Sequence, residues 1–280
     1  MKRSLVLLLA ALAFNSPSRG AGTDSAGTII REGEVLQYKV KWTFFRLGTV
    51  TLRTVRDSTC REPGDIKVIM SVESNPDLSF IWIREFNECV VDTRTIDSRS
   101  FHARHRNGET YTEIWHTVDR SQHRTLYRVI DKNSGKELEA DTLRGVESFV
   151  EGPSLFLLAR CLSQSSGTKN VPTLVGGKLS TTELTYGGDR ELIDIGAVGN
   201  PVRVRKFLGT AHWQGGTEAG LGGEFTGWIS DDGAAVPIVA EVKVLIGSIK
   251  LELESWTRTG WAPPSGGMLS AMENAGGKTQ

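Results

Sequence analysis

Strict alternation of apolar and polar residues is the feature of this chain that most restricts its fold. In residues 33–44 the apolar side chains stand at every second position: Leu36, Tyr38, Val40, Trp42 and Phe44. Residues 236–246 repeat the pattern with Val236, Ile238, Ala240, Val242, Val244 and Ile246. A period of two predicts strands with one buried face and one solvated face, the pattern of antiparallel sheets.

Shorter segments of the same kind fill the rest of the chain. Strands are expected over residues 49–55, 66–72, 89–92, 100–106, 111–118, 125–130, 178–186, 191–195, 202–208, 225–230 and 249–256. Residues 80–86 fit either a strand or a short helical turn, and Asn107-Gly108 is a two-residue hairpin signal. The sequence predicts an all-β fold of about twelve strands, an antiparallel sheet curved into an open barrel or a sandwich.

One segment has helical spacing. Ser154 is a candidate N-cap, and Leu155, Leu158, Ala159 and Leu162 recur at intervals of three and four. We expect a helix of about nine residues that covers one end or one edge of the sheet.

The first twenty residues have the layout of a secretory signal peptide. Lys2 and Arg3 precede an apolar run over 4–14, and Ser18 and Gly20 supply small residues for cleavage. The run is too short to span a bilayer as a helix. The expected organisation is a signal peptide over 1–20, a flexible segment over 21–30, a β domain over 31–257 and a disordered tail over 258–280. The alternative is that the β domain divides into two near residues 163–173. We expect a periplasmic or secreted protein that is not integral to the membrane.

The charge balance and the cysteine content limit the binding partners and the disulfides that can be expected. The chain has 33 basic and 33 acidic residues, and removal of Lys2, Arg3 and Arg19 leaves 30 against 33. Such an overall balance lacks the basic character that binding to nucleic acid or to an anionic membrane surface would require. In an oxidising compartment, three cysteines favour one disulfide, which we assign to Cys60 and Cys89, with Cys161 as a buried small residue.

Two stretches carry a family resemblance. The first holds Gly33, Glu34, Leu36 and Tyr38, followed by the bend Leu47-Gly48-Thr49. The second is Trp228-Ile229-Ser230-Asp231-Asp232, followed by Val236-Pro237-Ile238. In this arrangement the chain resembles Domain of Unknown Function 3108, a family of exported bacterial proteins that brings no accepted activity or catalytic residues. Its shape is similar to the open barrels of lipoprotein carriers, which is an analogy of fold alone.

Few residues suggest chemistry. Asp231 and Asp232, with Glu224 nearby, could form a carboxylate site for glycoside hydrolysis or Ca²⁺, although Asp-Asp-Gly is also ordinary turn chemistry. The histidines have no zinc-ligand spacing, and no nucleophile elbow, phosphate loop or dinucleotide fingerprint is present, so we expect no metal, no cofactor and no catalytic residues.

Aromatic residues suggest binding. The inward tryptophans and tyrosines either fill the core of a wide sheet or line a cavity for acyl chains or sugars. The candidate ligand-binding residues are Tyr38, Trp42, Trp228, Asp231 and Asp232. The favoured hypothesis is a non-catalytic β-barrel-like protein that binds an apolar or amphiphilic ligand, such as a lipid or glycan, or an envelope protein. The alternatives are a carboxylate-dependent hydrolase of envelope glycan and a structural or assembly factor.

Overall fold

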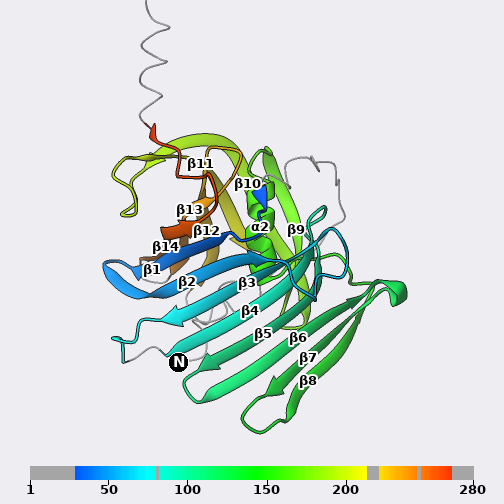
Figure 1. The fold of residues 1–280 in the computed structure, drawn as a ribbon. Helices are drawn as coiled ribbons and strands as arrows, with labels where there is room; N and C mark the ends of the chain where they lie inside the picture. Colours follow the sequence, from blue (N-terminus) through cyan, green and yellow to red (C-terminus); the bar gives the residue numbers. More distant parts are fainter. Residues whose placement is uncertain (1–28, 80–81, 213–220, 245–246, 267–280) are drawn as a thin grey trace, which may run out of the picture.

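The computed structural model describes residues 29–79, 82–212, 221–244 and 247–266. Fourteen strands form one antiparallel sheet in the order β8-β7-β6-β5-β4-β3-β2-β1-β14-β13-β12-β11-β10-β9. Every neighbouring pair is antiparallel, so the chain runs outward from β1 to β8 and returns from β9 to β14, which pairs with β1. The predicted all-β fold with an open, curved sheet is confirmed (Figure 1).

The first half of the sheet holds eight strands. They are β1 (Val35–Trp42), β2 (Phe45–Val55), β3 (Asp65–Ser74), β4 (Ile83–Asp92), β5 (Ser98–Asn107), β6 (Thr110–Asp119), β7 (Arg124–Asp131) and β8 (Glu137–Arg144). A 3₁₀ turn, η2 (Arg120–Gln122), joins β6 to β7. Of the ambiguous residues 80–86, residues 83–86 belong to the strand β4, whereas residues 80–81 lie outside the described residues.

The second half follows the helix α2 (Gly152–Cys161) and holds six strands. They are β9 (Gly167–Val175), β10 (Lys178–Ile193), β11 (Val202–Ala211), β12 (Leu221–Ser230), β13 (Pro237–Val244) and β14 (Ser248–Thr257). Residues 163–173, the alternative domain split, contain the start of β9, which pairs with β10 in the same sheet.

The helix lies inside the curve of the sheet and packs against β3 and β4 (Figure 1). Its buried residues include Leu157 and Arg160, and Phe156 makes an edge-to-face contact with Tyr38 of β1. The N-cap is Glu151 rather than the expected Ser154, which stands three residues later. The backbone N–H of Glu151 donates to the Ser154 hydroxyl at 2.8 Å, half of a capping box.

A buried ion cluster fastens the helix to the strands. Arg160 and Arg258 both contact the carboxylate of Glu34, and the side chains of all three are at most 3% exposed. Arg160 also donates to the backbone oxygens of Ile29 and Ala235 at 2.9 and 3.0 Å. Because each charge is paired and hydrogen-bonded, loss of one partner would leave an uncompensated buried charge.

This cluster changes the predicted chain ends. Ile29, expected in a flexible segment, is 2% exposed. Arg258 and the following residues, expected in a disordered tail, also pack on the sheet: Arg203 N–H donates to Pro264 at 2.9 Å and Ser265 bridges Val202. The reason is that Arg258 is held by Glu34 and the Trp261 indole donates to Asp232 at 2.8 Å. The predicted signal peptide and residues 267–280 lie outside the described residues.

The two outer strands, β8 and β9, are not paired with each other. The turn between β9 and β10 nevertheless packs against β7. At Gly177, where φ is +69°, an added Cβ would lie 2.7 Å from the Tyr127 ring. Glycine has no side chain and tolerates a positive φ, so it allows the β9–β10 turn to approach the Tyr127 ring closely. Through this contact the two halves of the open sheet meet.

Candidate functional site

A row of side chains crosses the inner face of the sheet from β1 to β5. Cross-strand pairing links Tyr38 to Val50, Val50 to Val72, Val72 to Glu85, and Glu85 to His105. Since Tyr38 meets helix residue Phe156, this is the face that encloses the helix. The row begins apolar and becomes polar at β4 and β5.

The next row on the same face is apolar apart from one residue. It runs from Leu52 through Met70 to Asn87 and then to Ala103 and Ile114. Met70, Asn87 and Ala103 are each at most 3% exposed. Glu85, Asn87 and His105, which we call the inner polar cluster, therefore stand among apolar neighbours on the concave side.

Hydrogen bonding inside the inner polar cluster is incomplete. The His105 Nε2 lies 2.9 Å from the Asn87 Oδ1, so the imidazole donates to the amide oxygen. Glu85 is 7% exposed, and its Oε1 is buried with no hydrogen-bond partner among the described residues. A buried polar atom without a partner costs roughly 1–3 kcal/mol and needs a reason.

Burial also sets the charge of the cluster. Burial raises the pKa of Glu85 to about 8, and a smaller opposing contribution comes from the hydrogen bond with Asn87. Burial lowers the pKa of His105 to about 4. At pH 7 both groups are mainly neutral, so the cluster presents a carboxylic acid, an amide and an imidazole without net charge.

A second buried polar group lies further along the same face. His116 of β6 bonds to Glu151 at the start of the helix, and the Ser98 hydroxyl links Cys89 at 3.2 Å to Ser154 at 3.1 Å. Burial raises the pKa of the Cys89 thiol far above its usual range, which removes thiolate reactivity. Phe101 lies between Cys89 and His116 in the sheet register, so a Cys–His nucleophilic pair is not assembled.

The predicted aromatic ligand-binding residues are dispersed. Tyr38 is 2% exposed and its hydroxyl donates to Pro237 at 3.0 Å, which makes it a core residue at the end of the polar row. Trp42 is half-buried at the end of β1. The Trp228 indole donates to Glu191 at 2.7 Å, away from both of the others.

The aspartate pair stabilises a turn. Asp231 forms ion pairs with Arg190 and Arg205, whereas the Asp232 carboxylate accepts from Ala234 N–H at 3.0 Å. Glu224 is at the other end of β12, exposed and paired with Lys243. The structure does not bring the three carboxylates together as a hydrolase or Ca²⁺ site requires.

The predicted disulfide is not formed in this structure. Cys60, Cys89 and Cys161 are free. Cys60 lies in the loop between β2 and β3, whereas Cys89 faces the interior three residues before the end of β4. Among the described residues, no group of three or more metal-ligating side chains is assembled.

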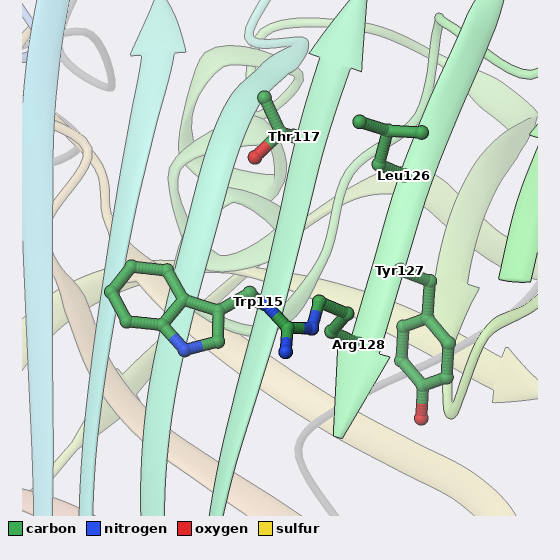
Figure 2. A pocket seen from close by; sticks show the side chains of 5 residues that line it. All are labelled: Trp115, Thr117, Leu126, Tyr127 and Arg128. Carbon is green, nitrogen blue, oxygen red and sulfur yellow. The ribbon is translucent and has the colours of Figure 1, made fainter. Parts of the chain in front are cut away.

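The outer face carries a shallow recess of about 350 Å³ over β6 and β7. Trp115, Thr117, Leu126, Tyr127 and Arg128 line it, and Figure 2 shows the Arg128 side chain extending towards the Trp115 indole. The indole stacks on His102 with ring centroids 3.6 Å apart, and Arg128 pairs with Glu137. The Arg128 charge is therefore paired and one face of the Trp115 ring is covered.

The inner polar cluster was missed in the sequence although a signal is present. Alternation along β4 places Glu85 and Asn87 on the face that carries Cys89 and Val91. An acid and an amide in phase with buried apolar residues indicate a polar group on an apolar face. The apolar residues before β4 obscured the phase because they also fit a helical turn.

Comparison with known families places the chain. Residues 37–254 match the family described as "Protein of unknown function (DUF3108)". The chain belongs to this family. The resemblance predicted from the two motif stretches is therefore confirmed, and DUF3108 membership brings no activity with it. No curated protein matches the chain.

One solved structure shows the same β-barrel-like fold as this DUF3108 protein. A β-barrel-like protein of the family DUF1849 from Brucella abortus aligns with a TM-score of 0.53 at 8% identity, over 81% of this chain and 98% of the other. A protein with a YmcC-like fold from Bacteroides fragilis aligns with a TM-score of 0.32 at 8% identity, over 82% and 97%. The first similarity supports the β-barrel-like architecture and nothing further. In the described part of the chain, no helix is long and apolar enough to cross a membrane.

Proposed function

We propose that this DUF3108 protein is a non-catalytic binding protein of the bacterial cell envelope whose inner face holds an amphiphilic ligand. The observation that carries the proposal is the Glu85 Oε1, which is buried without a partner. A ligand group that donates or accepts a hydrogen bond there would remove an energetic cost that the free protein bears.

The surroundings of the inner polar cluster specify the ligand further. Val72 and Met70 lie beside the polar side chains on β3, and Ala103 and Ile114 lie beside them on β5 and β6. Such a surface suits an acyl or other apolar chain, with one polar group fixed by a few hydrogen bonds. The class of ligand is therefore an amphiphile with an uncharged, hydrogen-bonding head group.

Charge distinguishes this ligand from fatty acids. Because the pKa of Glu85 is about 8 and that of His105 about 4, the cluster offers no counter-charge at pH 7. An anionic head group placed there would be desolvated without compensation. Uncharged amphiphiles should therefore bind more tightly than their carboxylate analogues.

The test uses the mature chain and the neutral probe N-phenyl-1-naphthylamine, displaced by monooleoylglycerol or by oleate. We expect monooleoylglycerol to displace the probe at a concentration at least about tenfold lower than oleate. Glu85→Leu removes the hydrogen-bonding group and should weaken monooleoylglycerol binding by about tenfold, whereas Glu85→Gln retains both donor and acceptor and should bind nearly as the wild type.

Glu73→Gln is the matched control, since Glu73 lies on β3 next to Val72 but on the outer, exposed face. It should leave displacement unchanged. Unchanged binding by Glu85→Leu, with a melting temperature no lower than that of the wild type, would overturn the proposal.

A further inference from the structure

One end of the sheet gathers exposed aromatic and basic side chains. The strand ends that flank the β1–β2, β3–β4 and β5–β6 connections lie at the same end of the sheet, because consecutive strands are antiparallel, and Figure 1 shows these strand ends together at its left. Residues 80–81 of the β3–β4 connection lie outside the described residues. Backbone hydrogen bonds connect them: Asn75 N–H donates to Leu47 at 2.7 Å, and Gly108 N–H donates to Trp82 at 3.1 Å. We call this end of β1–β6 the aromatic rim.

The apolar part of the aromatic rim is unusually exposed. Phe44 is 83% exposed, the highest value among the large apolar side chains of the described residues, and its neighbour Phe45 is 50% exposed. Their ring centroids are 4.4 Å apart, and Trp82 at the β3–β4 end is 48% exposed. Thr43 has a φ of 55°, a left-handed conformation within the turn that carries Phe44. Two adjacent phenylalanines in a turn expose apolar surface to water, which is unfavourable. Such exposure indicates that this turn contacts an apolar phase.

The basic part of the aromatic rim lies beside Trp82. Arg84 of β4 and Arg106 of β5 are directly opposite each other in the sheet. Their guanidinium carbons lie 5.9 and 5.1 Å from the Trp82 ring centroid, and Arg106 is also 6.0 Å from Tyr111. Neither arginine forms a salt bridge among the described residues, whereas the nearby Arg46 is held by Glu254 at 2.6 Å.

This arrangement costs stability in the isolated protein. Like charges directly opposite each other on a sheet are destabilising, and the cation–π contacts offset only part of the repulsion. An external anion between the two guanidinium groups would relieve it. The aromatic rim therefore lacks an apolar partner for its phenylalanines. Glu73 of β3 lies opposite Arg84 in the sheet register, but no ion pair forms between them in the described structure, so both guanidinium groups remain available to an external anion.

We propose that the aromatic rim docks on the surface of an anionic lipid bilayer. Phenylalanine and tryptophan enter the boundary between head groups and acyl chains, while arginines contact lipid phosphates at the same depth. An anionic glycan or an acidic peptide would satisfy the arginines but would give no apolar phase to Phe44 and Phe45. An anionic bilayer surface offers both an apolar phase for the phenylalanines and phosphate groups for the arginines.

This inference stands apart from the proposed function. It rests on residues of the turns and the outer face, whereas the amphiphile proposal rests on Glu85 and its neighbours on the inner face. Membrane docking can be measured with no ligand bound, and probe displacement can be measured with no vesicle present, so either can fail alone.

The experiment is co-sedimentation of the mature chain with vesicles of phosphatidylcholine alone or mixed with phosphatidylglycerol. We expect binding to the mixed vesicles and at least about tenfold weaker binding to phosphatidylcholine alone. The double variant Arg84→Gln/Arg106→Gln should lose about tenfold in affinity for the mixed vesicles, and Phe44→Ser/Phe45→Ser a similar amount.

Matched controls come from surfaces away from the aromatic rim. Arg61→Gln/Arg144→Gln makes the same charge change in exposed residues at the opposite end of the sheet, and Leu208→Ser changes an apolar residue that is 50% exposed on β11. Both should bind the mixed vesicles as the wild type does. The phenylalanine and arginine side chains are exposed at the surface, so the variants should fold normally, which thermal melts check.

Three results would overturn the proposal: no co-sedimentation with mixed vesicles, equal losses in the control variants, or binding that depends on the arginines and not on the phenylalanines. The last result would indicate a soluble anionic partner, and dextran sulfate would then compete with the vesicles.

Discussion

Glu85→Gln gives the sharpest test of the inner polar cluster through the pH dependence of stability. The folded protein holds the pKa of Glu85 at about 8, above its ordinary value of 4.5. The folded state therefore binds more protons than the unfolded state between these values, and stability falls as pH rises through that window. His105 acts oppositely: its lowered pKa, about 4 against 6.5, makes stability rise between pH 4 and pH 6.5.

Because the two effects oppose each other, the contribution of Glu85 to stability can be measured separately only in one pH interval. Below pH 6.5 the contributions of Glu85 and His105 largely cancel, whereas above it only Glu85 still titrates. Linkage then predicts that the wild type loses about 1–2 kcal/mol of unfolding free energy between pH 6.5 and pH 8. Glu85→Gln has no proton to lose and should show no fall in that interval.

Urea unfolding followed by tryptophan fluorescence, at closely spaced pH values, measures both curves. Glu73→Gln, which changes an exposed glutamate on the outer face of β3, should follow the wild-type curve. A wild-type curve that is flat between pH 6.5 and pH 8, or a Glu85→Gln curve that falls as steeply as the wild type, would refute the burial argument.

Three further predictions follow from other parts of the fold. Glu34→Gln should lower the free energy of unfolding by about 3–5 kcal/mol in urea, because two buried arginines lose their carboxylate, whereas Glu254→Gln at an exposed pair should cost less than about 1 kcal/mol. Gly177→Val should lower the melting temperature by several degrees, since the side chain meets both an aromatic ring and a left-handed backbone; an unchanged temperature would mean that the β9–β10 turn does not pack as described. In the folded protein a thiol reagent should modify Cys60 and leave Cys89 unmodified until urea is added, and a Cys60–Cys89 disulfide in the purified protein would contradict the free thiols.

The sequence predicted the strands that have one buried face. The alternating stretches at 33–44 and 236–246 contain β1 and β13, and the alternation arises because these strands are covered on one side. Two strands were missed. Residues Glu137–Arg144 of β8 are mostly exposed on both faces, so no alternation arises. The first half of β9 (Gly167–Val175) is also mostly exposed, and these residues were interpreted as a possible domain split. The segment after residue 257 was expected to be disordered because of its Gly and Pro content, which conceals the two side chains that hold residues 258–266 on the sheet, Arg258 and Trp261.

The candidate site could not be derived from sequence alone. Asn87 and His105 become neighbours through the register of β4 and β5, which a chain of short strands does not specify by itself. The predicted site at Asp231 and Asp232 followed turn chemistry, and the structure assigns their carboxylates to that turn and to Arg205. What the sequence contained, and what was not used, was an acidic residue in phase with the buried face of β4.

The measurement that tests the central claim most directly is the location of a bound amphiphile. Nuclear Overhauser contacts from monooleoylglycerol to the protein would identify it. We predict contacts from the glycerol protons to the His105 ring and the Asn87 amide, and from the acyl chain to the Met70 methyl group. Contacts confined to Trp115 and Leu126 in the outer recess, or no contacts at all, would contradict the account.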